Sequence, residues 1–256
     1  MIDIQNISKR FGKLKALDGV SATFKEGQAV SLIGPNGSGK TTLIKCLLGM
    51  VIPDDGVMRF KGTDVMTTCD YRRDIGYMPQ IGRYPDNMRI SQIFDMMIDL
   101  RKNHNILLDE ELLDAFDLKK QFDKPMRTLS GGTIQKVSAC LAFLFDPSVL
   151  ILDEPTAGLD PVASEILKAK VLKEKKRGKL ILMTSHILSD LEEMTTDVMY
   201  LQDGKMQFFK PVEELKPATN ETRLARAIAS VMTGGVSFKM NGHATSVTLK
   251  ELPIKI

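Results

Sequence analysis

The stretch Gly34-Pro35-Asn36-Gly37-Ser38-Gly39-Lys40-Thr41-Thr42 decides the fold of this chain. It follows the apolar run Ala29–Ile33 and precedes a helical pattern of apolar residues over 43–48. The glycines let successive backbone N–H groups turn inward around a phosphate, and the helix N-terminus adds partial positive charge. Lys40 can reach the β- and γ-phosphate oxygens of a nucleotide, and the Thr41 hydroxyl can bind Mg²⁺. The stretch therefore predicts a strand, a phosphate loop and a helix.

A second motif delivers two carboxylates to the end of a buried strand. The apolar run Val149–Leu152 is followed by Asp153, Glu154 and Pro155. Ligands of α/β sheets bind at the carboxyl ends of strands, so Asp153 is expected to hold Mg²⁺ through water. Glu154 is then placed to orient or deprotonate the water that attacks the γ-phosphate. The alternative, a carboxylate pair that caps a helix, is disfavoured by the phosphate loop in the same chain.

A third motif, Leu129-Ser130-Gly131-Gly132, opens a predicted helix between the other two. The three motifs together, in this order, arise by accident in well under ~0.1% of chains, so a set of unrelated glycine turns is excluded. One nucleotide site has no evident use for the Ser130 to Gly132 segment. Its presence implies that a second copy of the chain takes part.

The composition describes an ordinary globular protein. The chain has 256 residues, 43% hydrophobic and 26% charged, with a formal net charge of +3 that argues neither for nor against nucleic acid. No apolar run approaches the ~18 residues of a membrane span, and the acidic, alternating N-terminus is unlike a signal peptide. Cys46, Cys69 and Cys140 lack metal-ligand spacing and indicate a reducing compartment, most simply the cytoplasm.

The pattern along the chain predicts an α/β fold with two additions. Continuous apolar runs at Ala29–Ile33, Val149–Leu152 and Leu180–Met183 are typical of parallel strands covered on both faces by helices. Alternating residues near the N-terminus and at Val57–Phe60 predict antiparallel strands, and 198–209 predicts a hairpin with a two-residue turn. Residues 85–146 contain helical patterns only and predict an inserted helical subdomain between the first and second core strands.

Two further segments have helical patterns. Residues 216–256 predict a small C-terminal extension, with a helix at Glu221–Met232 followed by a short hairpin. The basic residues between 168 and 179 end a helix before Gly178, where cations suit the helix dipole. A solvated helix face is favoured for this run over a lipid or nucleic-acid patch.

The ordered motifs resemble the ATP-binding subunit of an ABC transporter over residues 1–215. The resemblance implies a P-loop NTPase (RecA-like) parallel-sheet core with an N-terminal antiparallel β subdomain and an inserted α-helical subdomain at about 85–146. It implies ATP hydrolysis with ATP and Mg²⁺ as cofactors. The signature here is Leu129-Ser130-Gly131-Gly132-Thr133, with Thr133 where the family usually has Gln. In the family, the Ser and the second Gly contact the γ-phosphate bound to the opposite subunit.

The resemblance also implies roles for four single residues. Gln80, in Tyr77-Met78-Pro79-Gln80, senses Mg²⁺ and the γ-phosphate, and His186 contacts the γ-phosphate. Asp160 lies in a loop that faces the other subunit. Phe11 sits where the family has an aromatic residue that stacks on adenine, although a role in the core of the N-terminal strands stays open. Outside the family context, Gln80 and His186 would be ordinary loop and strand-end residues.

The implied partners are a second copy of the chain, in an ATP-sandwich homodimer, and an integral-membrane permease. The permease would dock near Gln80 and the Ser91–Lys102 helix, which has more apolar surface than one core stripe needs. A helix buried on two sides is the equal alternative. The chain would be peripheral on the cytoplasmic face of the membrane. No nucleic acid is expected, because the chain has one cassette and no heptad run, unlike most soluble ABC ATPases that remodel ribosomes or nucleic acid.

The segment Tyr77 to Met88 resembles the ATPases of copper-processing exporters linked to nitrous oxide reductase maturation. The single cassette also resembles the ATPases of bacterial multidrug-type exporters. The substrate implied by these resemblances is copper-related or drug- or lipid-like.

Overall fold

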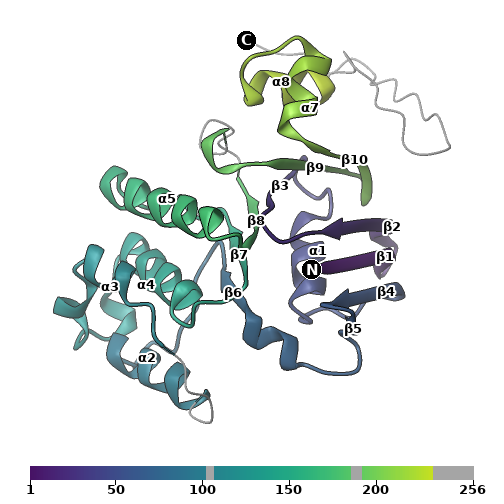
Figure 1. The fold of residues 1–256 in the computed structure, drawn as a ribbon. Coiled ribbons are helices and arrows are strands. Elements are labelled where there is room, and N and C mark those ends of the chain that lie inside the picture. The colour runs from purple at the N-terminus through teal and green to yellow at the C-terminus, as the bar shows by residue number, and fades with distance from the viewer. Residues whose placement is uncertain (102–106, 186–191, 233–256) are drawn as a thin grey trace.

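Two sheets organise the protein, whose structure is a computed structural model that describes residues 1–101, 107–185 and 192–232. The larger sheet has the strand order β10-β9-β3-β8-β7-β6 (Figure 1). Its strands β3, β6, β7, β8 and β9 run parallel, and β10 pairs antiparallel with β9. The bounds are β3 Ala29–Ile33, β6 Ile75–Met78, β7 Val149–Asp153, β8 Leu180–Thr184, β9 Asp197–Gln202 and β10 Lys205–Pro211.

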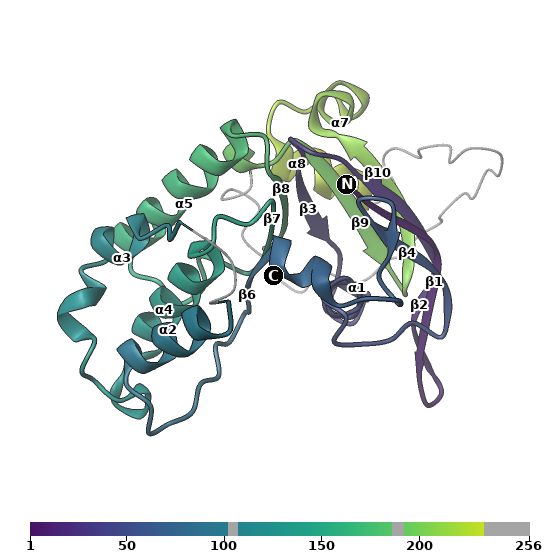
Figure 2. The ribbon, with the colours of Figure 1, turned by 60° about the horizontal axis from the view of Figure 1, so that its bottom comes forward.

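The larger sheet is buried on both faces, which is why its central strands are continuously apolar. Along β7, Leu150 and Leu152 pack with the helices of one layer, whereas Val149 and Ile151 pack with the other layer. The first layer contains α4 (Gly131–Phe143) and α5 (Pro161–Lys176). The second contains α1 (Lys40–Leu47) and the smaller sheet, on the opposite side of β7 and β8 (Figure 2).

The smaller sheet is the antiparallel N-terminal subdomain that the sequence predicts. Its strand order is β2-β1-β4-β5, and its bounds are β1 Ile2–Phe11, β2 Leu14–Phe24, β4 Asp55–Phe60 and β5 Thr63–Asp64. The predicted hairpin at 198–209 is also confirmed as β9 and β10. Its turn residues Asp203 and Gly204 both have positive φ, 49° and 75°, as a two-residue hairpin turn requires.

The helical subdomain contains α2 (Ile90–Asp99), α3 (Glu111–Ala115) and α4, with short 3₁₀ turns between them. One expectation about its place is wrong. It follows β6, so it lies between the second and third parallel strands rather than the first and second. The sequence did not reveal β6 because it has four residues and includes Gly76. That glycine lets α4 approach closely, since a Cβ there would clash with the Ala142 carbonyl oxygen.

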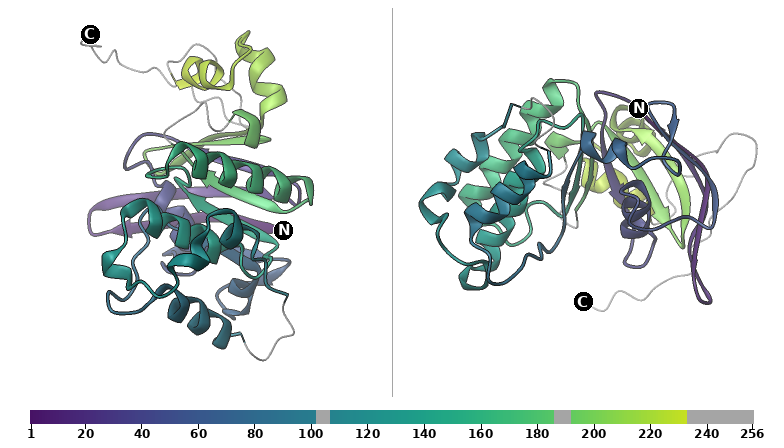
Figure 3. Two further views of the ribbon diagram at one scale, coloured as in Figure 1. Left: turned by 90° about the vertical axis from the view of Figure 1, so that its left-hand side faces the viewer. Right: turned by 90° about the horizontal axis from the view of Figure 1, so that it is seen from below.

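The C-terminal part packs on the cassette through the apolar face of α8 (Leu224–Met232), which confirms the predicted helix. Leu224 and Ile228 join the same apolar cluster as Leu215 of α7 (Val212–Thr219). Helix α7 runs across residues 215 and 216, where the sequence suggested a boundary, and lies far from α2 (Figure 3). The hairpin expected after Gly235 falls outside the described residues. Cys46 and Cys140 are buried, as expected of core residues.

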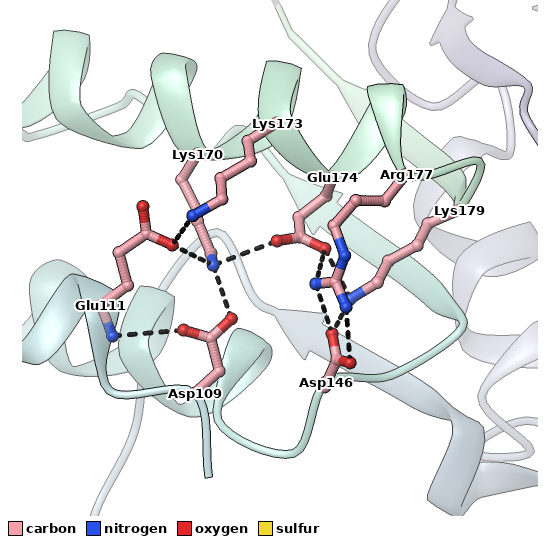
Figure 4. A network of polar contacts seen from close by, with 8 residues as sticks. All are labelled: Asp109, Glu111, Asp146, Lys170, Lys173, Glu174, Arg177 and Lys179. Atoms are coloured by element: carbon pink, nitrogen blue, oxygen red, sulfur yellow. Dashed lines mark hydrogen bonds and ion pairs between the residues drawn. The ribbon is translucent and has the colours of Figure 1, made fainter. Parts of the chain in front are cut away.

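The basic run at 168–179 is not a simple solvated face, which corrects the sequence interpretation. The side chains of Lys170 and Glu174 are 2% and 0% exposed, and Lys170 Nζ lies 3.0 Å from Glu174 Oε1 (Figure 4). Lys170 Nζ also donates to Asp109 and Glu111 of the helical subdomain, at 2.5 and 2.7 Å. Burial lowers the pKa of Lys170, but hydrogen bonds to these three carboxylates raise it overall. The lysine therefore stays charged and joins α5 to the segment before α3.

The other half of this network joins α5 to the end of α4. Arg177 donates to both Asp146 oxygens at 2.8 Å, and Lys179 Nζ contacts Asp146 and Glu174 at 2.5 and 2.6 Å. These contacts fix the helical subdomain against α5 by charge as well as by apolar packing.

Candidate phosphate and carboxylate site

The phosphate loop joins β3 to α1, and its backbone packs closely against backbone atoms of β2 and β9. Gly34 and Gly39 have φ of 150° and 106°. A Cβ on Gly34 would clash with the Leu201 carbonyl oxygen, and one on Gly39 would lie 2.5 Å from the Ala16 carbonyl oxygen. Both positions therefore require glycine. Within the part of the chain that the structure describes, Ser38 Oγ is buried and has no hydrogen-bond partner in the protein, so this hydroxyl could bind a phosphate oxygen.

Lys40 folds back over the phosphate loop. Its Nζ donates to the carbonyl oxygens of Gly34 at 2.7 Å and Pro35 at 3.0 Å. Burial lowers the pKa of Lys40, and the negative charges of Glu154 and Asp153 oppose that effect. The ammonium thus sits over the loop in the field of both carboxylates. An anionic phosphate would be a stronger partner for it than the two neutral carbonyls.

Asp153 and Glu154 share one partner, Thr184 at the end of β8. Thr184 Oγ1 donates to Asp153 Oδ1 at 2.6 Å and accepts from the Glu154 backbone N–H at 3.0 Å. The Asp153 side chain is buried at the end of β7, and Glu154 turns away with a φ of 51°. The two carboxylates therefore leave the strand in different directions, which fits their expected division of roles. Thr184 was not among the predicted site residues.

The strand order brings most of the predicted site to one edge of the sheet. Neighbouring strands β3, β8, β7 and β6 are parallel, so their carboxyl ends meet there. Gly34 follows β3, Thr184 ends β8, Asp153 ends β7, and Gln80 lies two residues beyond β6. Gln80 is exposed. His186 lies outside the described residues. The edge can thus hold a phosphate chain between the loop, a buried carboxylate and an exposed amide.

Phe11 projects from the antiparallel subdomain rather than joining its core. It ends β1, is 49% exposed, and lies beneath Lys9 Nζ at 5.7 Å from the ring centroid. Strand β2, which pairs with it, also supplies Ala16, whose carbonyl packs behind the phosphate loop. About half of Phe11 is therefore exposed, and stacking on a flat ligand needs only one face of the ring.

The signature residues stand apart from the phosphate loop of the same chain. Ser130 caps α4, and its Oγ accepts from the Thr133 backbone N–H at 3.2 Å. The Thr133 hydroxyl lies 2.9 Å from Ser130 Oγ, so the residue that replaces the family Gln supports the cap. Helix α4 packs on the opposite face of the larger sheet from α1 (Figure 1). A ligand held by the Lys40 loop would therefore not use the α4 N-terminus of its own chain.

A groove of about 370 Å³ opens between the core and the helical subdomain. Its walls carry aromatic and apolar side chains and two guanidinium groups, from Tyr77, Tyr84, Met97, Phe145, Arg72 and Arg101. The sequence left two alternatives for helix α2, a helix with an exposed docking surface and a helix buried on two sides. In the structure one side of α2 is buried in the core and the other side lines the groove. Phe94 is buried and stacks on Phe122 with ring centroids 5.7 Å apart, so at this residue α2 follows the core alternative. Met97 is half-buried and faces the groove.

Comparison with known proteins explains why these features occur together. Residues 17–157 match the family model described as "ABC transporter". The chain belongs to the ABC transporter family. As an ABC cassette it is an ATP-binding subunit and an ATP hydrolase, and the parallel-sheet core with its antiparallel subdomain is the fold of that family. A soluble ABC ATPase that remodels ribosomes or nucleic acid is not favoured.

This ABC cassette is similar in sequence to several named ATP-binding proteins. It is 32% identical over 208 residues to a Nod factor export ATP-binding protein I from Burkholderia lata, covering 80% of this chain and 68% of that protein. It is 30% identical over 217 residues to the ABC transporter ATP-binding protein YtrB of Bacillus subtilis, covering 84% and 74%.

Solved structures of ABC cassettes resemble this one. The structure of an ATP-binding subunit of an ABC transporter superposes with a TM-score of 0.82 at 25% identity, covering 91% of this chain and 99% of that chain. A dimeric cassette, MJ0796 bound to ADP and Pi, superposes with a TM-score of 0.71 at 22% identity, covering 82% and 98%, and supports the fold alone. Among the described residues, no helix is both long enough and apolar enough to cross a membrane.

Proposed function

We propose that two copies of this cassette sandwich two ATP molecules, with Ser130 and Gly132 of each copy completing the site on the other. The observation that carries this proposal is the position of α4. Its N-terminus lies on the opposite face of the sheet from α1, so a second chain is needed to bring a signature to each phosphate loop. Helix N-termini favour anions, and Ser130 and Gly131 are exposed while Gly132 is partly exposed, which suits a segment that would face a γ-phosphate.

The residues of one chain fit ATP with Mg²⁺. The orphaned Ser38 hydroxyl and the folded-back Lys40 ammonium suit phosphate oxygens, and Phe11 offers a ring for adenine. Within the described ranges no three His, Cys, Asp or Glu side chains cluster around a cation site. Mg²⁺ would thus be held by Thr41, Asp153 and Gln80 together with phosphate oxygens, the usual arrangement for this ion. The ion would supply positive charge against the phosphate oxygens, and Glu154 would orient the attacking water.

A membrane permease is the proposed partner for the groove beside Gln80. Arg101 stacks on Phe145 at 4.2 Å and donates to the Arg73 carbonyl oxygen, and Arg72 donates to the Gly49 carbonyl oxygen. Both guanidiniums are thus held by neutral acceptors in the walls of the groove. A short amphipathic permease helix with an acidic residue would fit this surface. The cassette would then be peripheral on the cytoplasmic face, and the export proteins among its relatives support export as the direction.

The dimer is tested with the Glu154→Gln variant, which should bind ATP and hydrolyse it at least ~100-fold more slowly, as expected for loss of a general base. ATP and Mg²⁺ should convert this variant from monomer to dimer by size-exclusion chromatography with light scattering. Adding Lys40→Ala to the same variant is the matched control and should stay monomeric. An ATP-loaded monomer at high protein concentration would contradict the sandwich.

Complementation tests which chain supplies the signature. Lys40→Ala and Ser130→Arg chains should each be inactive alone. Mixed, they should recover hydrolysis, because each mixed dimer holds one intact site. No recovery on mixing would mean that both motifs serve the same site.

Docking is tested by retention on washed membranes of the source cells. Arg101→Glu should reduce the retained fraction, whereas Lys205→Glu on the exposed side of β10 should not. Equal retention of both variants would place the permease elsewhere.

A further inference from the structure

Two successive turns of α4 contact the loop that precedes α5. At the first turn, a Cβ on Gly132 would lie 2.9 Å from the Gly158 carbonyl oxygen, so the helix start abuts the loop directly. Lys136 is four residues further along and therefore lies on the same face of α4. Its Nζ donates to Asp160 Oδ2 at 2.7 Å. The start of the signature helix and the 158–160 loop thus form one continuous surface.

Asp160 uses its two carboxylate oxygens on two different helices. Oδ1 accepts from the Ala163 backbone N–H at 2.9 Å and caps α5. Oδ2 accepts from Lys136, and this hydrogen bond is the first cause of the lowered pKa of Asp160. The Lys136 side chain is 23% exposed, and its Nζ lies 5.8 Å from the ring centroid of Phe116. Lys136 is therefore held in place by packing as well as by its ion pair.

The other end of the same loop is Glu154, the residue expected to activate water. Glu154 is anchored through its backbone to Thr184, and the turn continues with Ala157 N–H donating to the Glu154 carbonyl oxygen at 3.1 Å. Leu159 N–H then donates to the Thr156 carbonyl oxygen at 3.3 Å. The segment from Glu154 to Asp160 is therefore fixed at one end by the catalytic edge of the sheet and at the other end by the signature helix.

We propose that Lys136 is a positioning residue for ATP hydrolysis. It holds the 158–160 loop in a fixed position relative to α4, the signature helix, which begins with the Ser130 to Gly132 segment. The inference rests on the proposed dimer, in which the signature serves the ATP of the opposite chain. When the Ser130 to Gly132 segment of one chain binds the phosphate of its partner, Lys136 would also fix the position of residues 158–160 in the first chain. These residues follow Glu154, which serves the first chain's own ATP site. The two sites are then coupled within each chain by one ion pair.

Kinetics of matched variants test this role. Lys136→Met removes the ion pair and keeps the length of the side chain, and Asp160→Asn removes it from the other side while keeping a residue that caps helices well. Each should lower kcat by about tenfold or more, because small displacements of a positioned group have large kinetic effects. ATP affinity of the monomer should stay unchanged, because the phosphate loop is untouched.

A conservative change and a remote one complete the set. Lys136→Arg keeps the charge and the reach and should restore most of kcat. Lys120→Met, which removes an exposed lysine paired with Asp117 three residues earlier, should leave kcat and KM as in the wild type. The Lys136→Met, Asp160→Asn double variant should be no slower than the slower single variant, since both changes remove one interaction. Thermal unfolding midpoints control for loss of structure.

The Glu154→Gln background separates the inference from the proposed dimer. If Glu154→Gln alone fails to dimerise with ATP, the dimer proposal fails. If it dimerises and Lys136→Met weakens that dimer at least tenfold while Lys136→Arg does not, the inference is supported. Wild-type kcat in Lys136→Met, or additive losses in the double variant, would overturn the role of Lys136 and leave the dimer standing.

Discussion

Thr184 Oγ1 donates a hydrogen bond of 2.6 Å to Asp153 Oδ1, and both side chains are buried at the shared edge of β7 and β8. The same hydroxyl oxygen accepts from the Glu154 backbone N–H. One threonine thus fixes the direction of the carboxylate expected to hold Mg²⁺ and the backbone that carries the carboxylate expected to activate water. Thr184 is therefore expected to position both carboxylates, although it lies at the end of an apolar strand whose sequence does not indicate this role.

Thr184→Val should therefore impair hydrolysis more than it impairs folding. Valine keeps the shape of threonine but leaves Asp153 Oδ1 and the Glu154 N–H without this partner. We expect kcat to fall by about tenfold to a hundredfold, as for other misplaced catalytic groups. Thr184→Ser keeps the hydroxyl and should retain most activity. Steady-state ATPase assays at matched unfolding midpoints measure both, and equal kcat in the two variants would contradict the role.

The two faces of α2 should respond differently to truncation. Phe94→Ala removes a buried ring that stacks on Phe122 and should cost about 3 kcal/mol or more of unfolding free energy. Met97→Ala removes a half-buried side chain that lines the groove and should cost about 1 kcal/mol or less. Urea unfolding measures the difference. Similar losses for both would mean that the helix is buried on both sides.

Lys170 and Lys173 provide a matched pair for the buried ion network, because both bind Glu111. Lys170 is 2% exposed and Lys173 is 57% exposed. Lys170→Met should cost about 3 kcal/mol, since it leaves the buried Glu174 without one of its cations. Lys173→Met should cost less than about 1 kcal/mol, as is usual for exposed pairs. Chemical denaturation tests the ranking, which equal costs would refute.

Asp146 makes the stability of the network depend on pH. The hydrogen bond from Arg177, followed by that from Lys179, lowers the pKa of Asp146 to about 2 in the folded protein. Because the folded-state pKa is depressed, the stabilisation is present above the unfolded-state value of about 3.9 and is lost as pH falls toward 2. Asp146→Asn should therefore destabilise the protein at pH 7, by about 1 kcal/mol for this partly exposed group.

The same difference should shrink as pH falls from about 4 toward 2. Asparagine tolerates the positive φ of 47° at this position, so the comparison isolates the charge. Urea titrations of both proteins at several pH values give the result. A difference that does not change with pH would show that Asp146 contributes through its shape alone.

The sequence predicted the elements whose patterns are strong and local. Ala29–Ile33 and Val149–Leu152 are continuous apolar strands, and the glycines between 34 and 39 mark a phosphate loop. The pattern missed β6, because four residues with Gly76 among them carry no periodic signal. The interpretation of residues 168–179 as a solvated helix face rested on their charge alone. Burial of Lys170 depends on Asp109, which is 61 residues away, and no local pattern contains that information.

The candidate site divides in the same way. Residues within the motifs, such as Lys40 and Asp153, could be assigned because their chemistry depends on short spacing. Thr184 could not, because its role depends on the β8 and β7 register that places it beside Asp153. The sequence left open which side of the Ser91–Lys102 helix meets the core, because that depends on packing partners such as Phe122.

The contact between Gly76 and α4 has a mechanical consequence. With no side chain at Gly76, the backbone of the signature helix rests directly on the strand that leads to Gln80. Beyond Gln80, Tyr84 Oη lies 2.8 Å from Ser138 Oγ of the same helix, so the helix is also fastened to the segment on the far side of that glutamine. Side chains between packed layers can absorb a small displacement, because they can change rotamer. At Gly76 there is no side chain to do so. A shift of α4 toward a partner should therefore displace the residues before and after Gln80 together.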